Sequence, residues 1–101
     1  MNKPYLQVVT EDRRLALLRL LAEASEYRAN DSVLTKALYA LGHDAARAQV
    51  LADLHWLAQV GLVDLDDAFR PVTVAVLTQH GGDVAAGRAS VPGVARPTPG
   101  T

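Results

Sequence analysis

The three histidines of this 101-residue chain are its candidates for metal binding. Zinc accepts both imidazole nitrogens and carboxylate oxygens as ligands, so a histidine close to an aspartate is the relevant pattern. Each histidine has such a neighbour, and the pairs are His43–Asp44, Asp53–His55 and His80–Asp83. Only the last pair has a spacing that puts both side chains on one face of a short helix. None matches a recognised metal site, so we predict turn and surface histidines, with no metal or other cofactor.

Catalytic groups are less well represented than metal ligands. The chain has no cysteine, which excludes a thiol nucleophile, a disulfide scaffold and a zinc ribbon. Ser25, Ser32 and Ser90 lie in or beside expected loops without a nucleophile motif. The pair Gly81–Gly82 is too short to form a phosphate-binding loop. We therefore predict that the protein is not an enzyme.

Composition limits the class of protein. Alanine (17) and leucine (15) dominate and only five residues are aromatic, which favours close-packed helices in a single domain. Ten Lys and Arg against eleven Asp and Glu give a net charge of −1, which excludes a polycationic tail but not a local basic patch. No apolar run is long enough for a transmembrane helix, and the N-terminus lacks the apolar stretch of a signal peptide. A cytoplasmic protein without a membrane partner is expected.

A first helix is predicted from Thr10 to about Ser25. Thr10 is a good N-cap, and the two acidic residues after it favour the positive end of the helix dipole. Leu15, Leu18 and Leu21 recur at helical spacing and form one apolar face. The polar residues 25–31 are expected to form a connection.

Two further helices follow, joined by a very short turn. Asn30 or Asp31 can cap the second, and Gly42 ends it. Its expected inward residues are Val33, Leu34, Ala37, Leu38 and Leu41. Asp44 can cap the third helix, which ends at Gly61, and its expected inward residues are Val50, Leu51, Leu54, Trp56, Leu57 and Ala58. Two helices joined by about three residues around a glycine have helix-turn-helix geometry.

The pattern then changes to that of a small β-hairpin. Residues 62–65 and 72–77 are rich in β-forming side chains, and the polar residues 66–71 separate them. Thr78 can cap a last helix that continues to about Arg88, weakened by three glycines.

The C-terminal residues have a different composition from the rest of the chain. From Ser90 on there are three prolines and two glycines, which predict an extended or disordered segment. The expected organisation is one domain over residues 1–90, followed by a flexible tail over residues 91–101.

This order of elements resembles the bacterial winged helix-turn-helix regulators of the ArsR-like kind. The residues that support the resemblance are the turn at 42–44, the exit Gly61-Leu62-Val63 into a first wing strand, and the Leu77-Thr78-x-x-Gly81 entry to the last helix. Small proteins of this type from Mu-like phages and prophages are the most similar, including their Pro- and Gly-containing tail. The resemblance covers about residues 10–90 and implies a mainly α fold with a small β-hairpin, in the order α-α-α-β-β-α.

The resemblance also implies a DNA-binding transcriptional regulator, with the third helix in a major groove and the hairpin as a wing. Arg47, one turn into that helix, could bind guanine through two hydrogen bonds, and Gln49 could bind adenine. The alanines around them allow close approach. Arg70 at the hairpin tip, with Lys36 and Arg28, could bind phosphates or an adjacent minor groove. Double-stranded DNA is the expected partner, and replacing Arg47 or Arg70 is expected to leave the fold intact.

The same residues fit a less specific interpretation. Arg47 and Gln49 could belong to a solvated helix face. Four aspartates expected on the same side would repel phosphate, and these are Asp44, Asp53, Asp66 and Asp67. The near-neutral charge and the Pro-rich tail favour a non-catalytic protein-interaction module, such as a phage accessory protein with the same fold. A positive stripe over the third helix and the hairpin would favour DNA, and a mixed or negative surface would favour a protein partner.

A homodimer is the remaining expectation. The final helix is the usual dimerisation element of this fold, and residues 84–86 (Val-Ala-Ala) offer it a surface of small side chains. Tyr5, Leu6, Val8 and Val9 have no evident partner in so small a domain. They could pack as a short strand against the hairpin, or take part in a dimer contact.

Overall fold

A computed structural model describes residues 2–98 of the chain. Within that span the chain forms a small, mostly α domain with a three-stranded antiparallel sheet in the order β1-β3-β2. The elements in chain order are α1 (Tyr5–Glu23), the 3-10 turn η1 (Ser25–Tyr27), β1 (Arg28–Asn30), α2 (Asp31–Ala40), α3 (Arg47–Gln59), β2 (Val63–Asp66), β3 (Val74–Leu77) and α4 (Gln79–Ala85).

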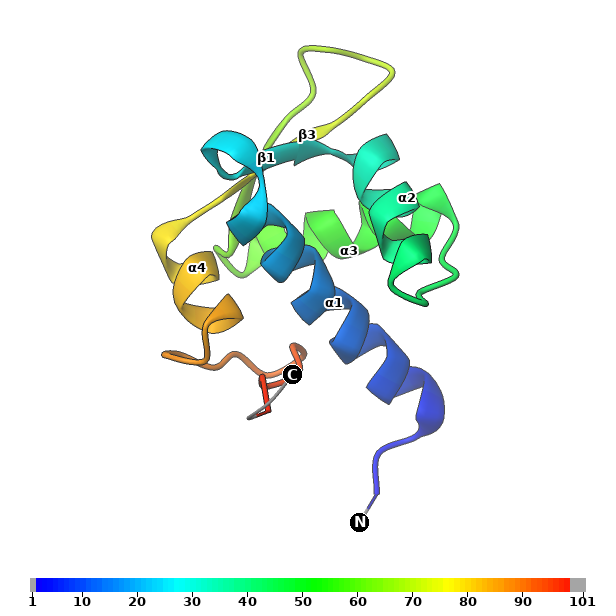
Figure 1. Ribbon diagram of the computed structural model, residues 1–101, viewed down its shortest axis with the longest axis vertical. Helices are drawn as coiled ribbons and strands as arrows, with labels where there is room; N and C mark the ends of the chain where they lie inside the picture. Colours follow the sequence, from blue (N-terminus) through cyan, green and yellow to red (C-terminus); the bar gives the residue numbers. More distant parts are fainter. Residues whose placement is uncertain (1, 99–101) are drawn as a thin grey trace.

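The long helix α1 crosses the whole domain (Figure 1). It packs against α4 on one side and α2 on the other, while α3 packs against α2 and β2. The sheet and the β2–β3 loop lie at the end of the molecule opposite the N-terminus (Figure 1). No helix within residues 2–98 combines the length and the apolar character needed to cross a bilayer.

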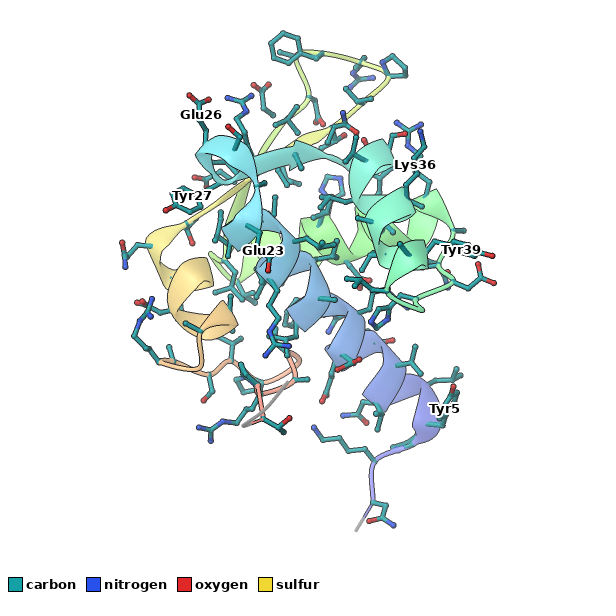
Figure 2. All side chains as sticks on the ribbon, in the orientation of Figure 1. Tyr5, Glu23, Glu26, Tyr27, Lys36 and Tyr39 are labelled. Atoms are coloured by element: carbon teal, nitrogen blue, oxygen red, sulfur yellow. The ribbon has the colours of Figure 1, made fainter. Side chains whose placement is uncertain are left out.

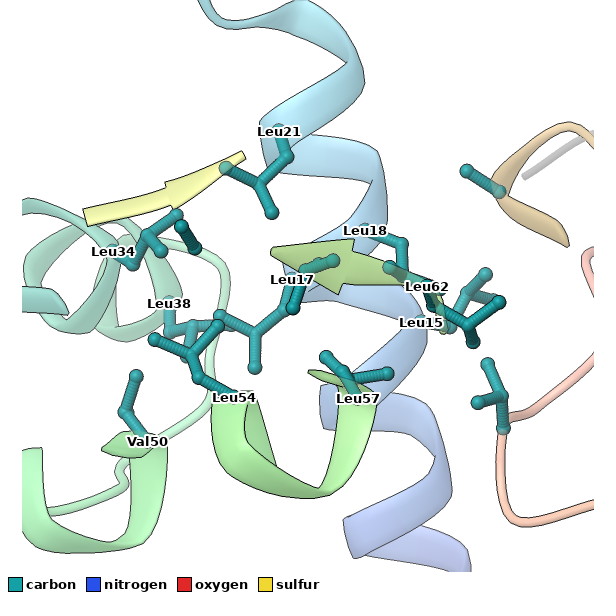
Figure 3. Packing of buried hydrophobic residues seen from close by; sticks show 14 of the residues in the cluster. Leu15, Leu17, Leu18, Leu21, Leu34, Leu38, Val50, Leu54, Leu57 and Leu62 are labelled. Carbon is teal, nitrogen blue, oxygen red and sulfur yellow. The ribbon is translucent and has the colours of Figure 1, made fainter. Parts of the chain in front are cut away.

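Leucines from the three long helices form the core. The cluster is continuous from α1 through α2 and α3 to the start of the hairpin (Figure 3). Its fully buried leucines are Leu17, Leu18, Leu21, Leu34, Leu38, Leu54, Leu57 and Leu62. The apolar faces predicted for α1 and α3 are therefore confirmed at Leu15, Leu18, Leu21, Leu54 and Leu57, whereas Leu51 is only partly buried and lies outside the core cluster.

The predicted hairpin is present. Val63 of β2 pairs with Leu77 of β3, and Asp66 pairs with Val74 at the loop end. The strand β1 was not predicted, because the polar residues 25–31 were expected to be a connection. Its three residues pair with β3 in the register Arg28–Val76 to Asn30–Val74, so this strand depends on a tertiary contact rather than on local sequence.

Two predicted helix caps are confirmed and two are wrong. Asn30 Oδ1 accepts the backbone N–H of Val33, and Thr78 Oγ1 accepts that of Gly81. Thr10 caps nothing, because α1 begins five residues earlier at Tyr5. Asp44 does not cap α3, which begins at Arg47 with Ala46 as its N-cap residue. The turn between α2 and α3 is therefore longer than the three residues predicted.

Several apolar residues have a different orientation from the one predicted. Val33 and Leu41 were expected to point inward, but they are 52% and 59% exposed. The reason is that α2 is only ten residues long and buries a narrow stripe through Leu34 and Leu38. In α4 the difference is the reverse. Val84 and Ala85 were expected to form an exposed surface for a dimer, but both side chains are buried in the domain.

Residues 90–98 fold back onto the domain instead of extending from it. Val94 is buried, the N–H of Ala95 donates to the carbonyl oxygen of Glu11, and Arg14 Nη1 donates to the carbonyl oxygen of Gly93. The prediction of a flexible tail over residues 91–101 is therefore wrong for residues 91–98, because the side chain of Val94 packs in the core. Residues 99–101 lie outside the described part of the chain.

Candidate nucleic-acid interface

The exposed face of α3 consists of alanines and of polar side chains without negative charge. Its exposed residues are Arg47, Ala48, Gln49, Ala52, His55 and Gln59. The one carboxylate between residues 47 and 59, Asp53, points inward and is 4% exposed. It accepts hydrogen bonds from Arg13 Nε at 2.5 Å and from Arg14 Nε at 3.2 Å. The prediction that Asp53 shares a surface with Asp44 is therefore wrong.

The first residue of α3 is joined to α2 and to the hairpin. Arg47 Nε donates to Asp31 Oδ2 at 2.5 Å, and Arg47 Nη2 donates to the carbonyl oxygen of Pro71 at 2.9 Å. The other carboxylate oxygen of Asp31 accepts the N–H of Thr73 at 2.8 Å. We call these four residues the Asp31 cluster. It connects the starts of α2 and α3 to the segment that enters β3.

Asp31 is charged in this cluster although its side chain is fully buried. Burial raises the pKa of Asp31, but the hydrogen bonds from Arg47 and from the N–H of Thr73 lower it by more, so the net shift is downward. The hydrogen bond to Asp31 raises the pKa of Arg47. Both groups therefore stay ionised around neutral pH.

This arrangement changes the expectation for Arg47. The sequence predicted a free surface side chain whose replacement would not affect folding. Instead, two of its nitrogens are used inside the protein, and its removal would leave a buried carboxylate without its cation. One signal for this was present in the sequence: Asn30 and Asp31 are adjacent cap candidates, and a helix needs only one of them.

The other four predicted contact residues are exposed. Gln49 uses its Oε1 to accept the N–H of Ala46 at 3.1 Å, which occupies the acceptor that an adenine contact would need. Arg28 lies in β1, Lys36 in α2 and Arg70 in the β2–β3 loop, and none of these three forms an ion pair with another residue in 2–98.

These three cations come from elements at one end of the molecule. The strand β1, the helix α2 and the β2–β3 loop lie together at the end opposite the N-terminus (Figure 1), and Figure 2 shows Lys36 pointing outward there. Arg47 lies beside them, because its guanidinium contacts both Asp31 of α2 and Pro71 of the loop. The structure thus brings the elements that carry the predicted cations to one end of the molecule (Figure 1), where Arg47 is paired with Asp31 and the other three cations form no ion pair within residues 2–98.

The aspartates of the β2–β3 loop are used to hold the loop. Asp66 Oδ1 accepts the N–H of Ala68, and Asp67 Oδ1 accepts the hydroxyl of Thr73, both at 2.9 Å. Asp44 and Asp64 are exposed without an ion pair to another residue in 2–98. The surface beside α3 therefore carries both positive and negative side chains, although α3 itself exposes no negatively charged side chain.

The histidines do not gather into a metal site among residues 2–98, where no three His, Cys, Asp or Glu side chains come together. His43 Nε2 lies 3.6 Å from Asp12 Oδ2, a neighbour that the sequence pairs did not include. His55 and His80 are exposed.

The fold and this surface define a small, mostly α protein with a compact hairpin, and comparison with known proteins gives its family. No protein-family model matches the chain. The chain is 45% identical over 92 residues to "Uncharacterized protein gp26" of Escherichia phage Mu, an alignment that covers 91% of this chain and 94% of that protein. It is 37% identical over 76 residues to an uncharacterized protein of Haemophilus influenzae, covering 75% and 74% of the two chains.

The chain therefore belongs to the family of phage Mu gp26. The resemblance to small proteins of Mu-like phages, inferred from the sequence, is confirmed at that level.

Proposed function

We propose that this protein is a DNA-binding winged-helix protein of the ArsR-like kind, and a phage transcriptional regulator, in which α3 enters the major groove. The order α1, α2, α3, β2–β3 hairpin and α4 supports this assignment, and the β2–β3 loop would be the wing. The observation that carries the proposal is the exposed face of α3, which consists of alanines and polar side chains and presents no carboxylate, because Asp53 points into the domain.

The arrangement of that face suits a DNA groove. Ala48, Ala52, His55 and Gln59 follow one another at intervals of four, three and four residues, so they form one stripe along the helix. The two alanines would allow close approach to base edges, and the imidazole and amide supply hydrogen-bonding groups. Because the carboxylate of Asp53 is buried, it does not repel the phosphates of a bound duplex.

The free cations would supply the non-specific part of binding. Arg28, Lys36 and Arg70 are exposed and unpaired within the described chain, and they would contact phosphates beside the groove. Each neutralised phosphate contributes about 0.9 to the slope of log K against log salt concentration, so three give a slope of about −3 for one protomer. This is a modest electrostatic contribution, in keeping with the net charge of −1.

Arg47 takes a different role in this proposal from the one that the sequence suggested. Because its guanidinium binds Asp31 and Pro71, it would hold α3 and the β2–β3 loop in a fixed relation. We assign it as a positioning residue, and assign direct contacts to Ala48, Ala52 and His55.

A matched pair of substitutions at Ala52 tests the proposal. Ala52 is exposed in the middle of the stripe, and Glu and Gln are similar in size and both favour helix. With a fluorescein-labelled duplex of mixed sequence at low salt, we expect Ala52→Gln to bind like the parent within about threefold. Ala52→Glu should bind at least about tenfold more weakly, because it places a carboxylate against the phosphates.

Salt titration gives a second, independent measurement. Replacing Arg28, Lys36 or Arg70 singly by Gln should reduce the slope by about one phosphate's worth. The matched control is Arg96→Gln, an exposed arginine in the C-terminal segment, which should leave the slope unchanged. A folded parent protein that binds no duplex at low salt would contradict the proposal. The non-catalytic protein-interaction module would then be the better assignment.

A further inference from the structure

The only phenylalanine of the chain lies in the β2–β3 loop, exposed to solvent. Phe69 is 60% exposed, and residues 67–71 are all exposed. The loop projects from the sheet, beyond the body of the domain (Figure 1). A single exposed apolar residue is common on protein surfaces, so exposure alone indicates little. The shape and the neighbours of the loop are what indicate a function for Phe69.

Four hydrogen bonds of 2.9 to 3.2 Å give this loop a defined shape. They join Ala68 to Asp66, Val72 to Phe69, Thr73 to Asp67, and Arg47 of α3 to Pro71. The bond from the N–H of Val72 to the carbonyl oxygen of Phe69 closes a tight turn over residues 69–72. A side chain on an ordered backbone loses less conformational freedom when it binds, so Phe69 is preorganised for a contact.

The loop lies beside the start of α3. Arg47, the first residue of α3, donates a hydrogen bond to the carbonyl oxygen of Pro71, two residues after Phe69. An α-helix with its side chains is about 10 to 12 Å wide and the major groove of B-DNA about 12 Å wide, so a helix fills that groove. A loop beside the helix must then lie over the phosphate backbone or the neighbouring minor groove. This step rests on the proposed entry of α3 into the major groove.

We propose that Phe69 inserts from the minor groove between two stacked base pairs and bends the duplex. Apolar side chains, phenylalanine among them, act as wedges of this kind, and the kink that they cause is directed toward the major groove. The partner would be a duplex that is easily unstacked at one step, and pyrimidine–purine steps such as TA and CA have this property. The loop would therefore contribute sequence preference through the deformability of DNA, in addition to any base contacts of α3.

The side chain next to Phe69 favours a nucleic acid over an apolar protein partner. Arg70 is exposed and forms no ion pair with another residue in 2–98, so its guanidinium is available to a phosphate or to the minor groove beside the wedge. Asp66 and Asp67, the two acids of the loop, accept hydrogen bonds inside it. Apolar wedges beside basic side chains are the combination that minor-groove proteins use.

Bending can be measured by energy transfer between dyes at the two ends of a duplex of about 20 base pairs, which is stiff because the persistence length of DNA is about 150 base pairs. Binding of the parent protein should raise the transfer efficiency, because a kink shortens the end-to-end distance. Phe69→Ala should bind within about tenfold of the parent but leave the transfer at its level in free DNA. Phe69→Leu should keep most of the bend, since leucine also acts as a wedge.

Tyr5→Ala is the matched control for this measurement. Tyr5 is another aromatic residue, 78% exposed, but it lies at the N-terminal end of α1 (Figure 2), away from the β2–β3 loop. This variant should bend the duplex like the parent. Equal bending by Phe69→Ala and the parent overturns the inference, and so does a parent that binds without bending. A parent that binds no duplex contradicts the proposed function as well, so the two failures are distinguishable.

A mismatched duplex gives an independent measurement. A central T·T mismatch lowers the energy needed to unstack the bases, so the parent should bind that duplex about fivefold or more tightly than the matched one. Phe69→Ala should bind both duplexes equally, within about twofold. Ala52→Glu, on α3, should weaken binding to both by the same factor and leave the preference unchanged. Equal affinity of the parent for the two duplexes, or a preference that persists in Phe69→Ala, overturns the wedge.

Discussion

Arg47, at the start of α3, donates a hydrogen bond to the carboxylate of Asp31, sixteen residues earlier at the start of α2. The carboxylate is completely buried, while the arginine is 42% exposed. The second oxygen of Asp31 accepts the N–H of Thr73, so the carboxylate is hydrogen-bonded to two segments besides its own. A buried charge in this position stabilises the fold only while both partners remain.

Replacing Arg47 by alanine should destabilise the protein. The substitution leaves Asp31 buried without its cation and removes the contact to Pro71. We expect the Tm to fall by about 5 °C or more, as a loss of this kind does in a domain of about 100 residues. Arg28→Ala, at an exposed and unpaired arginine, is the control and should change Tm by less than about 2 °C. Equal Tm values for the two variants would show that the Asp31 cluster contributes nothing to stability.

Stability should decrease in acid in a way that depends on Asp31. Its pKa is depressed in the folded protein, so its contribution is complete above the unfolded value of about 3.9 and is lost as pH falls through the folded value. Urea unfolding between pH 7 and pH 2.5 measures this. Asp31→Asn should be less stable at pH 7 but should lose less stability below about pH 4. A residual slope is expected from Glu11, whose pKa is lowered by hydrogen bonds from Lys3 and Gln7.

Local signals in the sequence predicted the elements that are determined locally. Asn30 and Thr78 are caps because their side chains reach an N–H three residues on, which is a property of the residue type. Thr10 has the same property but is not used, because α1 starts five residues earlier, where the N–H of Val8 donates to the carbonyl oxygen of Pro4. The strand β1 has no local signal at all, since β3 creates it by pairing.

The sequence predicted which residues of the candidate interface are exposed. It did not predict which residues they contact inside the protein. Lys36 and Arg70 are exposed as the pattern suggested. The inward orientation of Asp53 depends on arginines about 40 residues earlier in α1, and no periodicity within α3 indicates such a partner. Likewise, nothing in the sequence around Arg47 indicates that it is paired, because its partner Asp31 lies on another helix.

A pair of leucine substitutions tests the core assignment. Leu54 is completely buried between the helices, and Leu41 is 59% exposed although the sequence pattern placed both inside. Leu54→Ala should cost about 2 to 5 kcal/mol, the usual range for a buried leucine. The same change at Leu41 should cost less than about 1 kcal/mol, since this side chain buries little apolar area in the folded protein. Denaturant unfolding measures both, and similar costs would contradict the orientation of α2.

Adjacent glycines in α4 should respond in opposite directions to alanine. A Cβ at Gly81 would overlap the carbonyl oxygen of Leu62 and lie 2.7 Å from Leu77 Cδ1, whereas a Cβ at Gly82 has no neighbour closer than 3.7 Å. Gly81→Ala should therefore cost about 2 kcal/mol or more. Gly82→Ala should stabilise the protein by up to about 1 kcal/mol, because alanine favours helix. Two stabilising changes in urea unfolding would show that α4 does not pack closely on Leu62.

Gly93 should control the contact between the C-terminal segment and Trp56, the only tryptophan of the chain. A Cβ at Gly93 would lie 2.6 Å from the indole ring, on whose face Arg14 stacks at 4.0 Å. Gly93→Ala should displace residues 90–98 and shift the tryptophan emission to longer wavelength as water reaches the ring. Gly87→Ala is the matched control, because Gly87 also has a positive φ (83° against 99°), but its Cβ would meet only Pro97, at 3.7 Å. Both variants should lose about 1 kcal/mol or more to backbone strain, and only Gly93→Ala should change the emission. An unchanged spectrum in Gly93→Ala would show that the segment does not cover Trp56.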